Sequence, residues 1–188
     1  ELGEGKTPNK HNRLYFKVEP LSEEIRTLIR TGEVPQERYK KKDIEIRNKF
    51  TDTGMDTKEA DKIKAILAGN MFVDGTRGIV QINEIMELVL DMFEDVMKKG
   101  PVANEPCIGV KVILTDCKLH EDAIHRGPAQ MYPAVRDGIR ATMATANPVL
   151  FEPVQTLQFT CPEEYTGEIS KLVSNKRGQL LSMEQEGT

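Results

Sequence analysis

The chain has 188 residues, of which 38% are hydrophobic and 30% charged, and its formal net charge is −4. This composition predicts a globular protein with its own hydrophobic core, and the negative net charge excludes a broadly basic nucleic-acid binder. No apolar run approaches the ~20 residues that span a bilayer, and the three cysteines form no C-x-x-C pair, so we expect a cytoplasmic protein with reduced thiols and no membrane contact.

The N-terminal part of the chain predicts a loop, a strand and a helix. Residues 1–13 are rich in Gly, Lys, Pro and Asn and show no apolar periodicity, which is typical of a loop. Residues 14–19 alternate between apolar and polar side chains and predict a short strand that Pro20 closes. Ser22 is a suitable N-cap for an amphipathic helix, and Gly32 marks the end of that helix.

The next segment predicts two further helices. Pro35 opens the first one, which contains the triple lysine at residues 40–42. Acidic residues flank these lysines, which favours a solvated helix face over an RNA-binding patch. Asp56 and Glu59 have the spacing of a capping box, and the apolar run that follows them stops at Gly69.

The middle of the chain predicts a loop, a long helix, a strand and another helix. Residues 70–78 are punctuated by glycine and predict a loop. An apolar stripe from residue 82 to 96 predicts a long helix, and the alternation at residues 108–115 predicts a strand. After Pro128, apolar residues recur every four positions and predict a helix that ends at Asn147.

The last segment, residues 151–188, predicts one β-α-β unit. Residues 154–160 and 180–183 are strand-like, and a helix that begins at Pro162 lies between them. A unit of this size is small for independent stability.

The connection between the predicted strand at residues 108–115 and the following helix holds two of the three histidines, His120 and His125. Loops on a rigid scaffold commonly carry functional groups. A metal site is one interpretation, but these histidines are five positions apart and neither a cysteine pair nor a third histidine is nearby. An acid–base site of His120, Asp122 and His125 is another, although no G-x-S-x-G motif accompanies it. An exposed polar turn is the simplest alternative.

Five ordered segments, NKHNR, DGTRG, AIHRG, LFEPV and CPEEYTGEISKLVSNKRGQL, resemble the C-terminal part of archaeal and eukaryotic elongation factor 2. The resemblance runs from about Lys6 to Glu186. It implies that residues 1–150 are the fourth domain, a ribosomal-protein-type two-layer α/β (α+β) fold whose first strand would precede Glu1. It implies that residues 151–188 are the first part of the fifth domain, a partial ferredoxin-like β-α-β unit.

The resemblance also implies a role for the histidine loop. In the family, the second histidine of D-A-I-H-R-G is converted to diphthamide and is the target of ADP-ribosylating toxins, and His125 occupies that position. The tip of the family's fourth domain enters the decoding site during translocation and contacts the codon–anticodon helix. The implied partners are therefore the ribosome, transfer RNA, messenger RNA and the diphthamide-synthesis enzymes. The other tip residues that we expect to contact RNA are Pro8, Asn9, Lys10, His11, Asn12, Arg13, His120, Asp122, Arg126 and Gly127.

Two departures from the family pattern are informative. Pro128 and Ala129 follow the histidine loop where the eukaryotic pattern has two glycines, which favours the archaeal branch. The chain has no G-x-x-x-x-G-K-[ST] phosphate loop, so GTP and magnesium would belong to a GTPase domain elsewhere in the parent factor. We therefore expect no cofactor, no metal and no catalysis in this chain, which would act as a rigid lever. The alternatives are the acid–base enzyme and a generic protein-interaction module.

Overall fold

The computed structural model of the chain describes residues 2–185, which divide into the units Glu1–Leu150 and Phe151–Thr188. The described residues of the first unit form a mixed α+β fold built on one five-stranded sheet. Within residues 2–185, none of the helices combines the length and the apolar character needed to cross a membrane.

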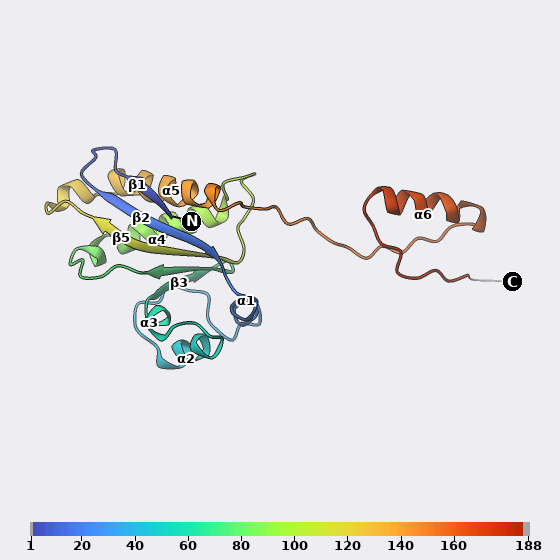
Figure 1. Cartoon of the computed structure of the whole chain (residues 1–188), viewed down its shortest axis with the longest axis horizontal. Coiled ribbons are helices and arrows are strands. Elements are labelled where there is room, and N and C mark those ends of the chain that lie inside the picture. Colours follow the sequence, from blue (N-terminus) through green and yellow to red (C-terminus); the bar gives the residue numbers. More distant parts are fainter. Residues whose placement is uncertain (1, 186–188) are drawn as a thin grey trace. The chain divides into compact units, whose positions relative to one another are not determined.

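The sheet consists of β1 (Leu2–Lys6), β2 (Arg13–Pro20), β3 (Ile63–Leu67), β4 (Asn70–Asp74) and β5 (Val110–Lys118). Its strand order is β1-β2-β5-β4-β3, and all neighbours are antiparallel except β4 and β5 (Figure 1). A parallel pair requires a crossover connection, and the chain between β4 and β5 forms a long helix that provides it. β5 thus lies in the middle of the sheet and joins the N-terminal strands to the β3–β4 hairpin.

Helices cover both faces of this sheet. The first unit contains α1 (Glu23–Arg30), α2 (Ile44–Asp52), α3 (Thr57–Ala60), α4 (Ile82–Lys98) and α5 (Pro128–Thr145). α4 and α5 pack side by side on one face and bury the larger apolar cluster there. The shorter helices α1 to α3 enclose a second cluster on the other side of β3 and β4 (Figure 1).

Strand alternation assigns each apolar side chain of β4 to one of the two clusters. Phe72 points to the α4 side, where its ring lies 5.3 Å from the ring of Phe93, measured between centroids. Its neighbours Met71 and Val73 belong to the second cluster on the opposite face. Both faces of β4 are therefore buried, which explains why its three central residues, Met71 to Val73, are all apolar rather than alternating.

The predictions for β2, α1, α4, β5 and α5 are confirmed, with small shifts at their ends. Ser22 caps α1 by accepting a hydrogen bond from the backbone N–H of Ile25. Gly32, which follows this helix, has a φ of +77°, a conformation in which glycine is unstrained. The recurrence of an apolar residue every four positions along α5 gives Met131, Val135, Ile139 and Met143, all of which are buried.

The expectation of a loop over residues 1–13 is wrong for residues 2–6, which form β1. Gly3 and Gly5 remove the apolar alternation that would have indicated a strand. They also let β1 lie directly against α5, because a Cβ at Gly5 would collide with the backbone carbonyl of Ala134. Among the described residues, β1 is therefore the first strand of the sheet.

The helix predicted from Pro35 is also wrong, because residues 35–43 are not helical and α2 begins only at Ile44. This segment runs beside β3 instead. The backbone N–H of Tyr39 donates to the carbonyl of Lys64 at 2.7 Å, and the N–H of Ile66 donates to the carbonyl of Glu37 at 3.0 Å. The lysines that follow Tyr39 therefore stand on an extended segment at the sheet edge.

The apolar run that ends at Gly69 is a strand, and the helix capped by Asp56 stops at Ala60. The loop expected at residues 70–78 is likewise strand β4 as far as Asp74. Ala68 and Gly69 form the two-residue turn between β3 and β4, and both have positive φ, of 49° and 77°. Positive φ at both positions gives a hairpin turn the twist of the flanking strands. A short apolar run fits a buried strand as well as a helix, so periodicity alone did not separate the two.

In the second unit, the described residues 151–185 contain the short helix η2 (Glu163–Tyr165) and α6 (Thr166–Asn175) but no strand. The strands expected at residues 154–160 and 180–183 are therefore wrong. Their backbones have no ladder partner within this unit, and their apolar side chains are exposed, with Val154 97% accessible. A single helix cannot bury two such segments, so the expected ferredoxin-like β-α-β unit does not form here.

Lys111 of β5 joins β2 and α3 by pairing with Glu19 of β2 at 2.8 Å and with Glu59 of α3 at 2.6 Å. Burial raises the pKa of Glu19, but the hydrogen bonds from Lys111 and Lys17 outweigh burial and lower this pKa below its ordinary value of 4.5. A lowered carboxyl pKa stabilises the fold at pH values above the ordinary pKa of the group. This stabilisation is lost as the pH falls below that value and through the lowered pKa of the folded state.

We therefore expect the free energy of unfolding to fall as the pH drops below about 4.5, and Lys111→Met to flatten this dependence. Urea unfolding across the acid range measures both effects. Lys49→Met is a control, because the one carboxylate that Lys49 pairs with among the described residues is the exposed Glu45, at 3.8 Å, and its other partner, the backbone carbonyl of Glu33, does not titrate. An acid dependence in Lys111→Met as steep as in the parent chain would contradict this interpretation.

Candidate functional site

Two loops meet at one end of the sheet, where they form the tip of the first unit. The first loop, residues 7–12, joins β1 to β2, and the second, residues 119–127, joins β5 to α5 (Figure 1). β2 and β5 are neighbours in the sheet, with Arg13 paired to Lys118, so both loops leave the sheet at the same point. Residues 7–13 and 119–127 are called the tip loops below.

Asn12 joins the two tip loops. Its side chain is fully buried, and its amide Nδ2 donates to the carbonyl of His125 at 2.8 Å. Its Oδ1 accepts from the backbone N–H of His120 at 2.9 Å. Asn9 adds a weaker bond to the same carbonyl of His125, at 3.4 Å, and its N–H donates to Gln130 at 2.9 Å. The backbone at both loop histidines is therefore fixed by the opposite loop.

Arg126 links the second tip loop to α4. Its guanidinium donates to the carbonyls of His120 and Glu121, the latter at 2.9 Å, and pairs with Glu84 of α4. The side chain is 5% exposed. Residues 123–126 form a tight 3-10 turn, and this turn directs Arg126 inward while His125 stays half exposed. Asn12 and Arg126 are thus internal braces, and the expectation that they present exposed donors to RNA is wrong.

All three histidines of the chain gather at the tip. The ring centroids of His120 and His125 are 4.4 Å apart, and His11 lies 4.5 Å from His125 and 5.0 Å from His120. The inference that no third histidine is nearby is therefore wrong, because His11 comes from the other loop. Nonetheless, the described residues contain no group of three or more His, Cys, Asp or Glu arranged to hold a metal ion.

The acid–base interpretation finds no geometry in its favour. The Asp122 carboxylate caps the 3-10 turn by accepting from the N–H of Ile124 at 3.0 Å. The N–H of Asp122 donates to Nδ1 of His120 at 3.0 Å, so this ring nitrogen acts as an acceptor. Within residues 2–185, no hydrogen bond links the Asp122 carboxylate to either histidine ring. The pairing that a hydrolytic site requires is therefore not formed.

The remaining tip residues differ in exposure. Pro8, Lys10, His11 and Arg13 are exposed on the first loop, and Asp122 is exposed on the second. Arg13 pairs with Glu4 across the strands at 3.2 Å, whereas Lys10 has no carboxylate partner within the described part of the chain. Gly127 and Asn9 are half-buried. Lys10 and Arg13 are thus the cations that the tip presents to solvent.

Cys117 lies at the base of the tip on β5 and is buried. Burial, together with the nearby carboxylates of Asp116 and Asp74, raises the pKa of this thiol to about 12. The thiol is therefore protonated near neutral pH and serves as an apolar core residue rather than a nucleophile.

Replacing Asn12 by alanine is expected to lower the free energy of unfolding by about 2 kcal/mol, because it leaves the N–H of His120 and the carbonyl of His125 without their partners. Hydrogen exchange measured by NMR should show faster exchange at the His120 amide. Asn48→Ala, an exposed helical position, is the control. Unchanged exchange at His120 would show that Asn12 does not hold the loop.

Comparison with known proteins places the first unit in a family. Residues 32–147 match the family model described as elongation factor G, domain IV. The chain belongs to the elongation factor G domain IV family. The matched residues include β3 to α5 and the tip loop with His120 and His125, whereas His11 and Asn12 lie before them.

Relatives extend the similarity of this domain IV chain to almost its full length. Elongation factor 2 of Methanocaldococcus jannaschii is 49% identical over 185 residues, which cover 98% of this chain and 26% of the relative. Elongation factor 2 of Thermococcus sibiricus is 48% identical over 184 residues, 98% of this chain and 25% of the relative. That of Archaeoglobus fulgidus is 46% identical with the same coverage. The chain thus spans about a quarter of the length of these relatives.

Proposed function

We propose that this chain is the part of an elongation factor 2 that acts in translation elongation, as a non-catalytic lever in ribosomal translocation. The tip loops would enter the decoding site and contact the codon–anticodon helix, with the ribosome, transfer RNA and messenger RNA as partners. The observation that carries the proposal is the tip itself, where three histidines from two loops converge on a braced backbone.

The shape and charge of the tip suit an RNA helix. A-form RNA offers a wide, shallow minor groove that proteins recognise mainly by shape and through 2′-hydroxyls and phosphates. A narrow projection with the cations Lys10 and Arg13 can enter such a site, although the chain as a whole carries a net charge of −4. The braces formed by Asn12 and Arg126 support a lever, because a tip that transmits force must not deform.

We also propose that His125 is the position of a diphthamide. The residue is half exposed, its ring lies 4.5 Å from the ring of His11 and 4.4 Å from that of His120, measured between centroids, and its carbonyl is held by Asn12. An ordinary imidazole is mostly neutral near pH 7, whereas diphthamide adds a quaternary cation whose charge does not depend on pH. Diphthamide-synthesis enzymes, and ADP-ribosylating toxins after modification, would then be further partners.

A mass spectrum of the tryptic peptide from Leu119 to Arg126, taken from natively produced protein, tests this assignment. The expected result is the added mass of diphthamide on His125. The corresponding peptide of a His125→Ala variant, produced in the same cells, is the control. An unmodified peptide from the native source would overturn the diphthamide proposal and with it the pH-independent charge at His125.

The second unit, residues 151–188, is proposed to be part of the fifth domain of the same factor. Its exposed apolar side chains support this assignment, since such side chains are typical of a surface that another part of a larger domain covers. They include Phe151, Val154, Leu157, Phe159, Leu180 and Leu181.

A further inference from the structure

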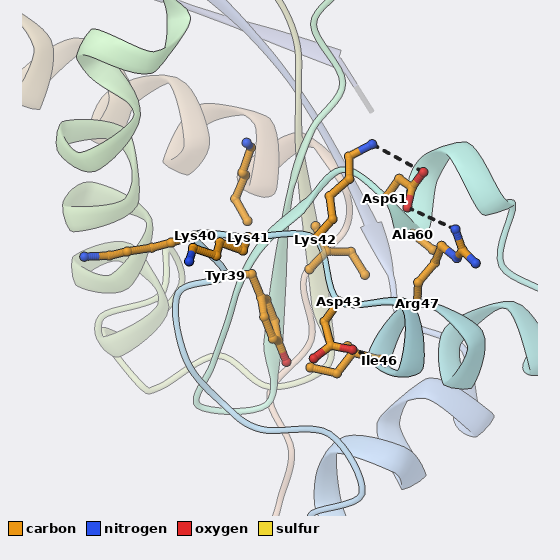
Figure 2. A pocket seen from close by; sticks show the side chains of 11 residues that line it. Tyr39, Lys40, Lys41, Lys42, Asp43, Ile46, Arg47, Ala60 and Asp61 are labelled. Carbon is orange, nitrogen blue, oxygen red and sulfur yellow. Dashed lines mark hydrogen bonds and ion pairs between the residues drawn. The ribbon is translucent and has the colours of Figure 1, made fainter.

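A group of basic side chains lies at the edge of the sheet beside β3. It consists of Lys40, Lys41, Lys42, Arg47 and Lys64, which line one pocket (Figure 2). We call this group the basic edge. β3 is the edge strand opposite β1, so the basic edge is separate from the tip loops, which extend from β1, β2 and β5.

The basic edge has more positive charge than its neighbours neutralise. Five basic side chains line the pocket with only two carboxylates, those of Asp43 and Asp61. Asp43 is engaged as the N-cap of α2, where it accepts from the N–H of Glu45 at 2.8 Å. Asp61 is shared by two cations, with Lys42 at 3.5 Å and Arg47 at 3.9 Å.

Figure 2 shows this arrangement: Lys42 and Arg47 converge on Asp61, and Lys40 extends away from that pair. Lys40 and Lys41 are exposed and, among the residues that the structure describes, have no carboxylate within 4.0 Å. The local excess of positive charge contrasts with the net charge of −4 of the chain.

The neighbouring Arg38, unlike these lysines, is neutralised by carboxylates of the fold. It lies two residues before Lys40 and contacts three carboxylates of α4, those of Glu87, Asp91 and Glu94, at 2.7 to 3.3 Å. The lysines beyond it receive no such partners, although they are on the same extended segment. Their positive charge is therefore directed to solvent rather than used to hold the fold together.

The chemistry of the basic edge favours a polyanion over an acidic protein. Protein interfaces centre on exposed aromatic or aliphatic anchors and are depleted in lysine. Here the apolar lining residues Ala60 and Ile63 are buried, and the half-buried Tyr39 and Ile46 pack against the second apolar cluster. No exposed ring is thus offered for stacking on an unpaired base, whereas lysines suit phosphate groups along a double helix.

We infer that the basic edge binds the phosphate backbone of a double-helical RNA and gives the chain a second RNA contact apart from the tip. The inference rests on the proposed function only for the origin of this RNA, the ribosome. The extended segment beside β3 presents Lys40 to Lys42 along the sheet edge, β3 contributes Lys64, and α2 contributes Arg47.

The test uses the full chain and a fluorescent RNA hairpin of about 16 base pairs, with binding measured by anisotropy at several salt concentrations. The variant carries Lys40→Gln, Lys41→Gln and Lys64→Gln. The matched control carries the same change of charge at three other exposed lysines, Lys99→Gln, Lys171→Gln and Lys176→Gln. Thermal unfolding confirms that both variants are folded.

The expected result is a loss of affinity of at least about tenfold near 0.1 M salt in the basic-edge variant only. The salt dependence of log K should become shallower by about 0.9 for each phosphate contact removed. Equal losses in both variants would show that only net charge matters, and no loss in either would show that the edge does not bind RNA. Each of these results would overturn the inference.

Two further arms separate this inference from its competitors. If polyglutamate competes as well as unlabelled RNA hairpin at equal charge, the edge is an unspecific cation patch and the RNA assignment is wrong. A tip variant, Lys10→Gln with Arg13→Gln, tests the proposed function through binding to small ribosomal subunits. Loss of hairpin binding in the basic-edge variant alone would support the inference even if the tip variant bound subunits normally.

Discussion

Arg126→Ala is expected to lower the free energy of unfolding by about 3 kcal/mol and to release the second tip loop. The substitution removes the donors to the carbonyls of His120 and Glu121 and leaves Glu84 without its cation. Glu84 is 55% exposed and can be solvated, so most of the loss comes from the loop carbonyls and the lost packing. Urea unfolding measures the stability, and NMR of the three imidazole rings reports whether the tip keeps its arrangement.

Arg136→Ala provides the matched control for this experiment. Arg136 is on α5, and its one salt bridge within residues 2–185 is with its neighbour Asp137, where the side chains are 46% and 65% exposed. An exposed pair of this kind contributes at most about 1 kcal/mol. If Arg126→Ala costs no more than Arg136→Ala, Arg126 is not a brace, and its inward position would have no bearing on the tip.

The second large effect is expected at Gly5, where alanine should lower the free energy of unfolding by about 3 kcal/mol. A Cβ at this position meets the backbone carbonyl of Ala134, which cannot rotate away as a side chain can. β1 must therefore shift away from α5 and lose part of its pairing with β2. Urea unfolding and hydrogen exchange of the β1 amides measure the two consequences.

Gly127→Ala is the control for this substitution. Gly127 has a φ of −68°, which any residue adopts, and a Cβ there meets no atom within 4 Å. Its expected cost is below about 1 kcal/mol, the small preference for glycine over alanine at an N-cap. Similar costs for the two variants would mean that the close approach of β1 to α5 does not limit the packing.

The elements that were predicted correctly are those whose burial is one-sided. α5 buries one stripe and β2 one face, so Met131 to Met143 and Leu14 to Val18 carry a clear period. β4 is buried on both faces and shows no period, and β1 packs through glycines and shows no apolar residue at the contact. The periodicity of a sequence reports a difference in side-chain character between two faces. β4 has no such difference, and in β1 the glycines of the buried face hide it.

The tip was predicted in outline but not in detail. The pattern placed His120 and His125 on a loop and indicated which residues surround them, but the neighbourhood of His11 depends on a contact across the sheet. Arg126 looked exposed because it lies next to His125, and only the tight turn directs it inward. A single buried Asn12 has no local sequence signal, because its partners are 113 and 108 positions away.

The central position of β5 sets the order in which the chain can acquire its structure during synthesis. The hairpins β1–β2 and β3–β4 connect residues close in sequence and can form as soon as they leave the ribosome. Neither can join the other until β5 is made, since β2 and β4 touch only through it. Until then, both hairpins have unpaired edges exposed to solvent, a state prone to association with other chains. A nascent chain of this protein therefore has its greatest need of protection in the interval that precedes residue 118.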